Sequence, residues 1–402
     1  MEHHETAAET AAAGTLTHLL FETAEQDPSA RLFSIPDSFG GWFDLTGAEF
    51  VLRVRALAKG FLAAELQVGD TVAVLCSNRY ETTLIDFAAA AIGVSVLPLE
   101  PESEQAELVA TLESSRARAV IVESVRDFAR VDEIQGDLPL VSDVWQVGLA
   151  DLDKLADLGR TVADEILDGR ILMVTPDTAA ALVRDDDRLM AVSHSTILTR
   201  VADLAVALDG LGAVDADDSG ILQILAPTDP FARLTATLAV ATSTRLGHLA
   251  LGHELIASLA SFRPTLLVAH PGTYVEIETA TYERADQAGR GPALRQALDV
   301  AIEYADANAE GSASRGLKTR YAVADTLVLR GLRKTVGGRI RAAVVIGGPI
   351  GSDPLLPQPL RRVIRGLDVV PLEVTLVGES LVVVKAQDAD EDDGSSPEPD
   401  EA

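Results

Sequence analysis

The sequence is poor in cysteine and in basic residues, and each shortage excludes a class of site or partner. Cys76 is the only cysteine, so the chain can form neither an internal disulfide nor a cysteine-based metal site. Because Cys76 ends the apolar run TVAVLC, we expect it in the core. The 33 Lys and Arg residues stand against 62 Asp and Glu, for a net charge of -29. This charge argues against nucleic acid and anionic membranes as direct partners.

The sequence also lacks long apolar segments. Stretches such as 87–99 are the most apolar, and they are too short to span a bilayer. The first residues, MEHHETAAETAAAG, contain no basic region followed by an apolar one, which argues against a secretory signal. We therefore expect a cytoplasmic protein without a transmembrane segment.

The two ends differ in composition from the rest of the chain. Residues 1–14 are rich in Ala and Glu without periodicity, and residues 386–402 form an acidic run with no apolar residue larger than alanine. We expect both ends to be disordered tails, and His3 and His4 to bind no metal there. Residues 15–385 then form the folded part, with expected subdomains at about 15–180 and 181–385.

Helical and strand patterns alternate through this folded part. Thr46 and Glu49 have the spacing of a capping box, and Phe50, Val54, Leu57 and Phe61 continue at helical spacing. Further helices are expected at 80–91, at 105–113 and after Pro230, with a polar helical excursion at 283–315. Short apolar runs predict buried strands at 71–76, 94–97, 119–122, 221–225, 266–269 and 342–346. Strands separated by helices predict an α/β fold with mostly parallel sheets covered by helices.

Several local patterns occur in one order along the chain, and together they resemble the long-chain fatty acyl-CoA synthetase branch of the adenylate-forming (AMP-binding) superfamily. Six series of the family have counterparts here: W-x-x-L-T-x-x-E-F at Trp42 to Phe50, G-D-x-V-A-I at Gly69 to Val74, N-R-x-E at Asn78 to Glu81, R-P-T at Arg263 to Thr265, R-Y-A-x-A-D at Arg320 to Asp325, and G-G-R-L at Gly337 to Arg339.

The resemblance implies the fold of the family's large N-terminal domain, with two helix-covered, mostly parallel sheets. Family members join a carboxylic acid to ATP as an acyl-adenylate and then transfer the acyl group to coenzyme A. A smaller C-terminal domain supplies a lysine for the first step and rotates for the second. Because the acidic tail stands where that domain should begin, we expect the C-terminal domain to be absent.

The family's phosphate loop, T-S-G-T-T-G-x-P-K-G, has no clear counterpart here. Its glycines let the backbone approach the phosphates of ATP, and its hydroxyl and N–H groups offset their charge. In this chain residues 179–183 match the preceding strand and Ser193-His194 the following T-H, but only Asp185, Asp186 and Asp187 precede Arg188, which stands at the lysine position. Like charges ~5 Å apart at an effective dielectric of ~20 cost roughly 3 kcal/mol per pair. We expect a tight polar hairpin turn instead.

Other site positions of the family are altered as well. Its G-Y-G-x-T-E motif falls at residues 374–379, where only Glu379 fits the magnesium-binding glutamate. Gly347 and Gly348 match a G-G pair that can line an adenine crevice, although close packing of strand and loop is the simpler explanation. Asp229 replaces the histidine of P-L-x-H. Arg188, Gly347, Gly348 and Glu379 are thus the vestigial nucleotide-site positions, and we expect no catalytic and no metal-binding residues. His194 and His270 are interpreted as hydrogen-bonded structural histidines.

The leading hypothesis is therefore an acyl-CoA-synthetase-like protein without catalysis, which acts as a binding, regulatory or scaffold protein in lipid metabolism. It predicts a protein partner or a homo-oligomer, leaves room for a fatty acyl ligand, and requires no cofactor. The alternative is a divergent fatty acid-CoA ligase that uses ATP, Mg and CoA and takes its C-terminal domain from a second chain. A purely structural or assembly protein is the third reading.

Overall fold

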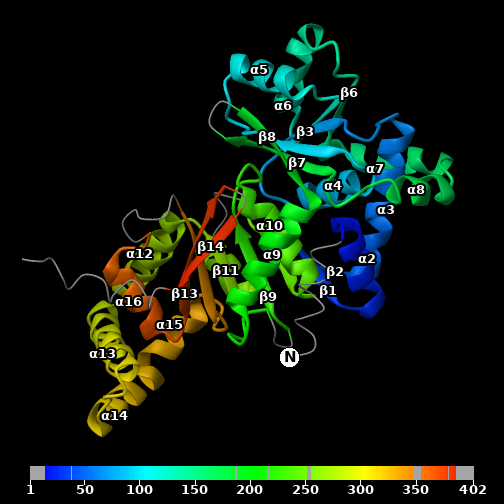
Figure 1. Cartoon of the computed structure of the whole chain (residues 1–402). Coiled ribbons are helices and arrows are strands. Elements are labelled where there is room, and N and C mark those ends of the chain that lie inside the picture. Colours follow the sequence, from blue (N-terminus) through cyan, green and yellow to red (C-terminus); the bar gives the residue numbers. More distant parts are fainter. Residues whose placement is uncertain are drawn as a thin grey trace, which may run out of the picture. The chain divides into compact units, whose positions relative to one another are not determined.

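A computed structural model of the chain describes residues 14–37, 39–185, 188–214, 218–250, 255–347, 355–378 and 380–385. The chain divides into two compact units. Unit 1 comprises 1–206 and 221–253, and unit 2 comprises 207–220 and 254–402. Helices alternate with strands that belong to two mixed sheets, so the predicted α/β fold is confirmed (Figure 1).

A six-stranded sheet forms one layer of unit 1. Its strand order is β6-β5-β3-β4-β7-β8, and every neighbouring pair is parallel except β7 and β8. Because parallel strands need both faces covered, the central strands are apolar and fully buried. The strands are β3 (Thr71–Leu75), β4 (Ser95–Pro98), β5 (Ala119–Val122), β6 (Asp143–Gln146), β7 (Ala179–Asp185) and β8 (Arg188–Ser193).

Helix α3 (Gly47–Ala63) begins at the predicted capping box: Thr46 accepts a hydrogen bond from the Glu49 N–H, and Glu49 accepts one from the Thr46 N–H. It packs very closely against α7 (Asp151–Leu158), because a Cβ on Gly60 would lie 2.4 Å from the Leu155 carbonyl oxygen. Other helices of the unit are α2 (Leu16–Gln26), α4 (Tyr80–Ala91), α5 (Gln105–Ser115), α6 (Val125–Ile134), α8 (Asp164–Ile171) and α10 (Pro230–Ala241), and α9 (His194–Leu208) runs to its boundary. Short 3-10 turns occupy Gln135–Asp137, Val147–Leu149 and Gly159–Thr161.

A second group of strands in unit 1 has the order β9-β10-β1-β2. These are β9 (Gly220–Ile224), β10 (Arg245–His248), β1 (Arg31–Pro36) and β2 (Trp42–Thr46). Strand β1 is parallel to β10 and antiparallel to β2. An aromatic contact ties this group to α3, since the rings of Phe33 and Phe50 lie 4.3 Å apart, centre to centre.

Unit 2 contains the strands β14-β13-β12-β11 in that order, with β11, β12 and β13 parallel and β14 antiparallel. They are β11 (Leu266–Ala269), β12 (Ala342–Ile346), β13 (Val370–Val377) and β14 (Ser380–Lys385). The helices are α11 (Leu255–Phe262), α12 (Pro271–Gln287), α13 (Gly291–Ala309), α14 (Arg315–Ala324), the π-helical turn η4 (Asp325–Leu329), α15 (Arg330–Thr335) and α16 (Gln358–Gly366).

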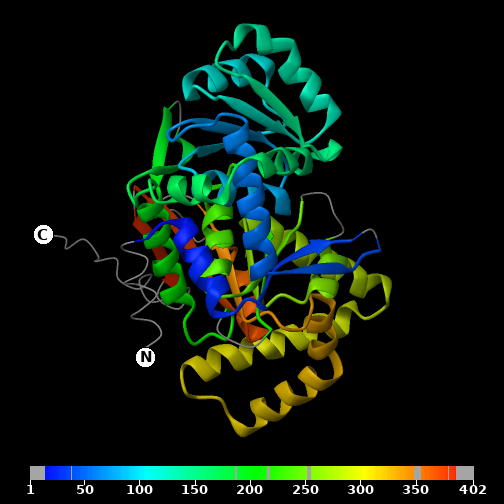
Figure 2. The same cartoon turned by 90° about the vertical axis from the view of Figure 1, so that its right-hand side faces the viewer.

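The polar excursion expected at 283–315 is helical. Helix α13 occupies most of it and lies beside α14, as Figure 2 shows for the yellow and gold helices. Tyr304 of α13 stacks on Tyr321 of α14 with ring centres 4.3 Å apart. This contact fixes the two helices to each other despite their polar surfaces.

The strands and helices predicted from apolar periodicity are present within one or two residues of their expected ends. The two predicted tails lie outside the described residues except for Gly14. Among the described helices, none combines the length and the apolarity needed to cross a membrane.

Candidate functional site

The hairpin of β7 and β8 stands where the sequence resemblance places a phosphate loop. The two strands pair without interruption from Ala181 with Val192 to Asp185 with Arg188. Only residues 186 and 187, both aspartates, connect the last pair, and they lie outside the described residues. The pairing confirms the expected hairpin. A connection of two residues cannot wrap several backbone N–H groups around a phosphate, which is what a glycine-rich loop does.

The basic side chains of this hairpin differ in their surroundings. Arg188 is exposed at the first position of β8. Arg184 on β7 is engaged by α5: it forms an ion pair with Glu107 at 2.6 Å and a hydrogen bond with Thr111. Two acidic residues follow β7, so Arg188 adds one cation to a hairpin whose connection carries two carboxyl groups.

Gly347 follows β12 in unit 2, at the carboxyl end of the strand. A Cβ at this position would lie 2.1 Å from Cδ2 and 2.7 Å from Cγ of Leu355, far inside van der Waals contact. The Gly347 N–H donates to the Val374 carbonyl oxygen at 3.2 Å. The Leu355 side chain thus occupies the space beside Gly347, and glycine is needed there for close packing. Gly348 and Glu379 lie outside the described residues, so their assignment to a vestigial nucleotide site stays a prediction.

The residues of the N-R-x-E pattern are used for bonds within unit 1. The Asn78 amide donates to the carbonyl oxygens of Gln223 and Leu249, at 2.9 and 3.0 Å. Arg79 forms ion pairs with Glu81 at 2.8 Å and with Glu123 at 3.2 Å. Hydrogen bonding to Arg79 is one reason that the pKa of Glu81 is lowered despite its burial, which opposes the shift. These contacts join β3 to β5, β9 and β10, so the residues of the N-R-x-E pattern hold strands of unit 1 together.

Two buried histidines of unit 1 are neutral for the same physical reason. Burial lowers the pKa of His194 to about 4 and that of His248 to about 4. Nδ1 of His194 accepts a hydrogen bond from the Leu16 N–H at 3.1 Å, which confirms its structural interpretation. His248 bonds to the Thr83 hydroxyl at 2.9 Å, and no motif pointed to it. Among the described residues no group of three His, Cys, Asp or Glu side chains is arranged to hold a metal ion.

Asp229, at the position of the family's histidine, caps a helix. Its carboxylate accepts a hydrogen bond from the Phe231 N–H at 2.8 Å at the start of α10. One turn later Arg233 forms a two-bond ion pair with Asp86, at 2.8 and 3.1 Å. The replacement of histidine by aspartate thus gives the position a local structural role.

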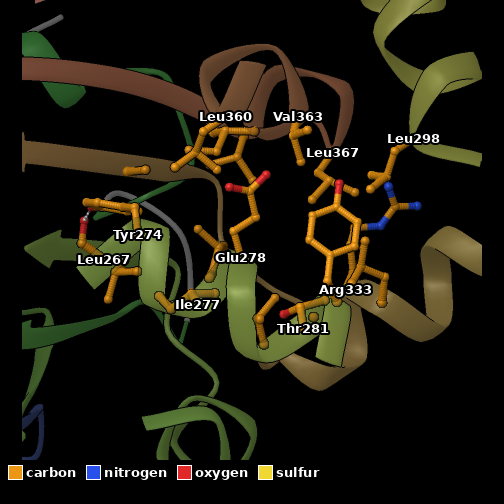
Figure 3. Close-up of a pocket in the computed structure, with 18 of the residues that line it drawn as sticks. Leu267, Tyr274, Ile277, Glu278, Thr281, Leu298, Arg333, Leu360, Val363 and Leu367 are labelled. Atoms are coloured by element: carbon orange, nitrogen blue, oxygen red, sulfur yellow. Dashed lines mark hydrogen bonds between the residues drawn. The ribbon is translucent and has the colours of Figure 1, made fainter. Parts of the chain in front are cut away.

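Unit 2 contains a pocket that sequence reasoning did not find. It holds about 110 Å³ and lies between α12, α13, α15, α16 and the strands β11 and β12 (Figure 3). Its walls are mainly aliphatic, and its apolar lining includes Leu267, Ile277, Leu294, Leu298, Leu332, Val336, Ile340, Ala343, Leu360, Val363, Ile364, Leu367 and Val369. Since these residues come from six elements at no fixed spacing, no sequence motif could reveal them.

A few charged groups interrupt this apolar lining. Glu278 of α12 extends into the pocket toward Leu360 in Figure 3. Burial raises the pKa of its carboxyl group. Arg333 is paired with Asp325, and Arg339 with Asp218 at 2.5 Å. Each arginine of the pocket thus has an aspartate partner, which Arg333 shares with Arg330, whereas Glu278 has no ion-pair partner among the described residues.

Known proteins resemble this chain in sequence and in fold. Residues 20–183 match the family model of the AMP-binding enzymes. The long-chain-fatty-acid–CoA ligase FadD15 of Mycobacterium bovis is 28% identical over 342 residues, which cover 83% of this chain and 56% of the ligase. The chain thus spans little more than half of the length of that curated relative.

Solved structures agree on the fold. The N-terminal domain of FACL13 from Mycobacterium tuberculosis superimposes with a TM-score of 0.66 at 14% identity, over 93% of this chain and 80% of that domain. A long-chain-fatty-acid-CoA ligase (FadD1) from Archaeoglobus fulgidus superimposes with a TM-score of 0.67 at 14% identity, over 94% of this chain and 67% of the ligase. These structures show that the chain has the fold of this N-terminal domain. The family match and the ligase alignment make the chain similar to the AMP-binding enzymes, and to long-chain fatty acid–CoA ligases among them.

Proposed function

We propose that this chain is an acyl-CoA-synthetase-like binding protein that does not activate carboxylic acids. The observation that carries the proposal is the uninterrupted pairing of β7 with β8 as far as Asp185 and Arg188. In the family this connection holds the phosphates of ATP, and here it is two aspartates long. Adenylation requires the nucleotide's triphosphate to be fixed and its charge offset, so a protein without this loop is not expected to form an acyl-adenylate.

The electrostatics of the hairpin support the same proposal. Acyl activation would bring a polyanion toward the two aspartates of the connection. Arg188 is one cation at its edge, and Arg184 on the other side is paired with Glu107. Each close pair of like charges costs about 3 kcal/mol at ~5 Å and an effective dielectric of ~20. Even one uncompensated pair therefore lowers affinity by roughly a hundredfold.

The proposed role is binding, regulation or assembly on the retained scaffold, in lipid metabolism and in the cytoplasm. The net charge of -29 favours a protein partner or a second copy of the chain over nucleic acid or an anionic membrane. A fatty acyl ligand is compatible with this role, and no cofactor is required by it. Mass spectrometry of small molecules and proteins that copurify from native cells would identify the ligand and the partner.

The decisive assay is ATP–pyrophosphate exchange with a panel of fatty acids, run beside the Mycobacterium bovis FadD15 ligase as a positive control. We expect exchange from the control alone. Calorimetry of this chain with Mg-ATP should show no binding heat, and Mg-ATP should leave its melting temperature unchanged. Exchange above background with any acid in the panel would refute the proposal and favour a divergent ligase that obtains a C-terminal domain from a second chain.

A further inference from the structure

The pocket of unit 2 has the form of a site for a small amphiphile. Aliphatic side chains of β11, α15 and α16 line it, among them Leu267, Leu332 and Ile364. A more polar groove adjoins it, because Glu278, Tyr282, Leu298 and Val363 line both spaces. An apolar body would bury itself in the pocket, while a polar head would lie at this junction beside Glu278 and water.

We propose that this pocket binds a small primary amine, with its aliphatic body between α12, α15 and α16 and its ammonium group facing Glu278. This site goes beyond the proposed function, because it lies wholly within unit 2 and needs neither ATP nor the β7–β8 hairpin.

The charges of the pocket select an amine rather than a carboxylate. Arg333 and Arg339, the two cations of the lining, already pair with Asp325 and Asp218. A carboxylate ligand could accept a hydrogen bond only from Arg333 Nη1, the one buried arginine nitrogen of the described lining without a hydrogen-bond partner, and it would lie near a like charge at Glu278. An ammonium group instead completes an ion pair with the carboxylate that has no partner among the described residues. Charge-assisted hydrogen bonds of this kind are the strong ones in partly buried sites.

The groups that surround Glu278 do not supply the absent counter-charge. On its own helix Tyr282 is neutral, and burial raises the pKa of its hydroxyl further. From α13, Arg295 is paired with Asp286 at 2.7 Å, and Asp299 adds another negative charge to the groove. Arg362 of α16 and Glu303 of α13 line the groove but not the pocket. The junction therefore keeps an acidic character, which suits a cationic head.

The volume of the pocket limits the size of the ligand's aliphatic part. A cavity of 150 Å³ accommodates benzene, so the 110 Å³ measured here suits an aliphatic group of about five carbons. A longer chain would have to emerge past Tyr282 into the groove. The ligand class is accordingly a branched or cyclic short-chain amine.

Three probes of nearly equal shape test the charge selection on the full chain: 3-methylbutylamine, 3-methylbutan-1-ol and 3-methylbutanoate. Ligand-observed NMR titration at neutral pH should give the lowest Kd for the amine and the highest for the acid. From the strength of a charge-assisted hydrogen bond we expect the amine to bind roughly tenfold or more tightly than the alcohol. Equal or tighter binding of the acid, or no saturable binding of the amine, would overturn the proposal.

Glu278→Gln keeps the size of the side chain and removes its charge. It should remove most of the advantage of the amine over the alcohol, while Glu283→Gln, an exposed position on the same helix, should leave it intact. Since burial raises the pKa of Glu278, the amine affinity of the unaltered chain should fall as pH is lowered through a value above the ordinary carboxyl pKa. An amine preference that survives Glu278→Gln unchanged would contradict the assignment. ATP–pyrophosphate exchange, which tests the proposed function, is independent of all these results.

Discussion

Replacing Gly347 by alanine distinguishes the two interpretations of this glycine. If Gly347 lines an open nucleotide crevice, a methyl group would extend into empty space and leave stability nearly unchanged. In the structure the new Cβ would instead lie 2.1, 2.4 and 2.7 Å from Cδ2, Cδ1 and Cγ of Leu355. Three such contacts cannot be relieved by rotating the end of the leucine alone, because Cγ is also too close. The leucine must change its χ1 rotamer or shift as a whole.

Overpacking of this kind costs about 1–3 kcal/mol. For a unit of this size, that free energy corresponds to a fall in melting temperature of roughly 2–12 °C. Leu355→Ala alone also destabilises, since it removes a half-buried side chain. In the double variant Gly347→Ala/Leu355→Ala the new methyl group occupies space that the leucine has left, so the two losses should be less than additive by about 0.5–3 kcal/mol.

Differential scanning calorimetry of the four proteins measures these effects, with the transitions of the two units resolved where they separate. Gly136→Ala is the matched control, because a Cβ there meets no heavy atom within 4 Å. A Gly347→Ala protein as stable as the unaltered chain, or strictly additive losses in the double variant, would show that Leu355 does not fill the space beside Gly347. The nucleotide-crevice interpretation would then be favoured.

Two further predictions concern buried charge. Because burial lowers the pKa of His194 to about 4, the folded state binds fewer protons than the unfolded state below the ordinary histidine pKa of about 6.5. The stabilising contribution is then fully present above that value and falls by about 3 kcal/mol as pH decreases toward the folded pKa. The free energy of unfolding of His194→Asn, measured with urea across this range, should depend less on pH than that of the unaltered chain. An unaltered pH dependence would contradict the assignment. Arg361 is only 2% exposed and pairs with Glu373 at 2.7 Å, so Glu373→Gln should cost about 3 kcal/mol in urea unfolding. Glu303→Gln, which breaks an exposed pair with Arg320 at 3.1 Å, should cost less than about 1 kcal/mol, and equal losses for the two variants would refute the reasoning.

Local physical chemistry accounts for how much of the fold was predictable. The capping box at Thr46 and the continuous apolar runs at β3, β5 and β12 are short-range signals, and each specifies its element without help from the rest of the chain. The resemblance supplied the layer arrangement. Strands with weaker patterns were not predicted: β6 (Asp143–Gln146) is only partly buried, and β2 (Trp42–Thr46) is half exposed, so neither shows a clear apolar face.

Candidate sites were harder to predict, because a pocket depends on residues that are distant in sequence. The exclusion of a phosphate loop required only the short segment between two recognisable strands, and the strand pairing agrees with it. Leu355, which fills the space next to Gly347, lies in a loop that no pattern singles out. Glu278 is one of three glutamates on a polar helix, and only the tertiary structure distinguishes it by placing it among aliphatic side chains.

The residues that match the family patterns make bonds or close contacts within the fold. This explains why they can be present in a chain without a phosphate loop. Asn78 and Arg79 hold strands of unit 1 together through the bonds described above. Gly337 has a φ of 93°, and a Cβ there would lie 2.5 Å from the Leu259 carbonyl oxygen. Each of these positions therefore contributes to the fold whether or not the chain binds a nucleotide.

A phosphate loop has the opposite character. Its glycines and hydroxyls serve a ligand, and here β7 and β8 stay paired up to Asp185 and Arg188 with only two residues between them. Loss of the loop is thus compatible with an unchanged fold, whereas loss of Asn78 lowers the stability of the fold. Asn78→Ala should unfold at lower urea than the unaltered chain, because the carbonyl oxygens of Gln223 and Leu249 each lose one donor. Substituting both connecting aspartates by Asn-Gly, the sequence favoured in two-residue hairpins, should leave stability equal or increased.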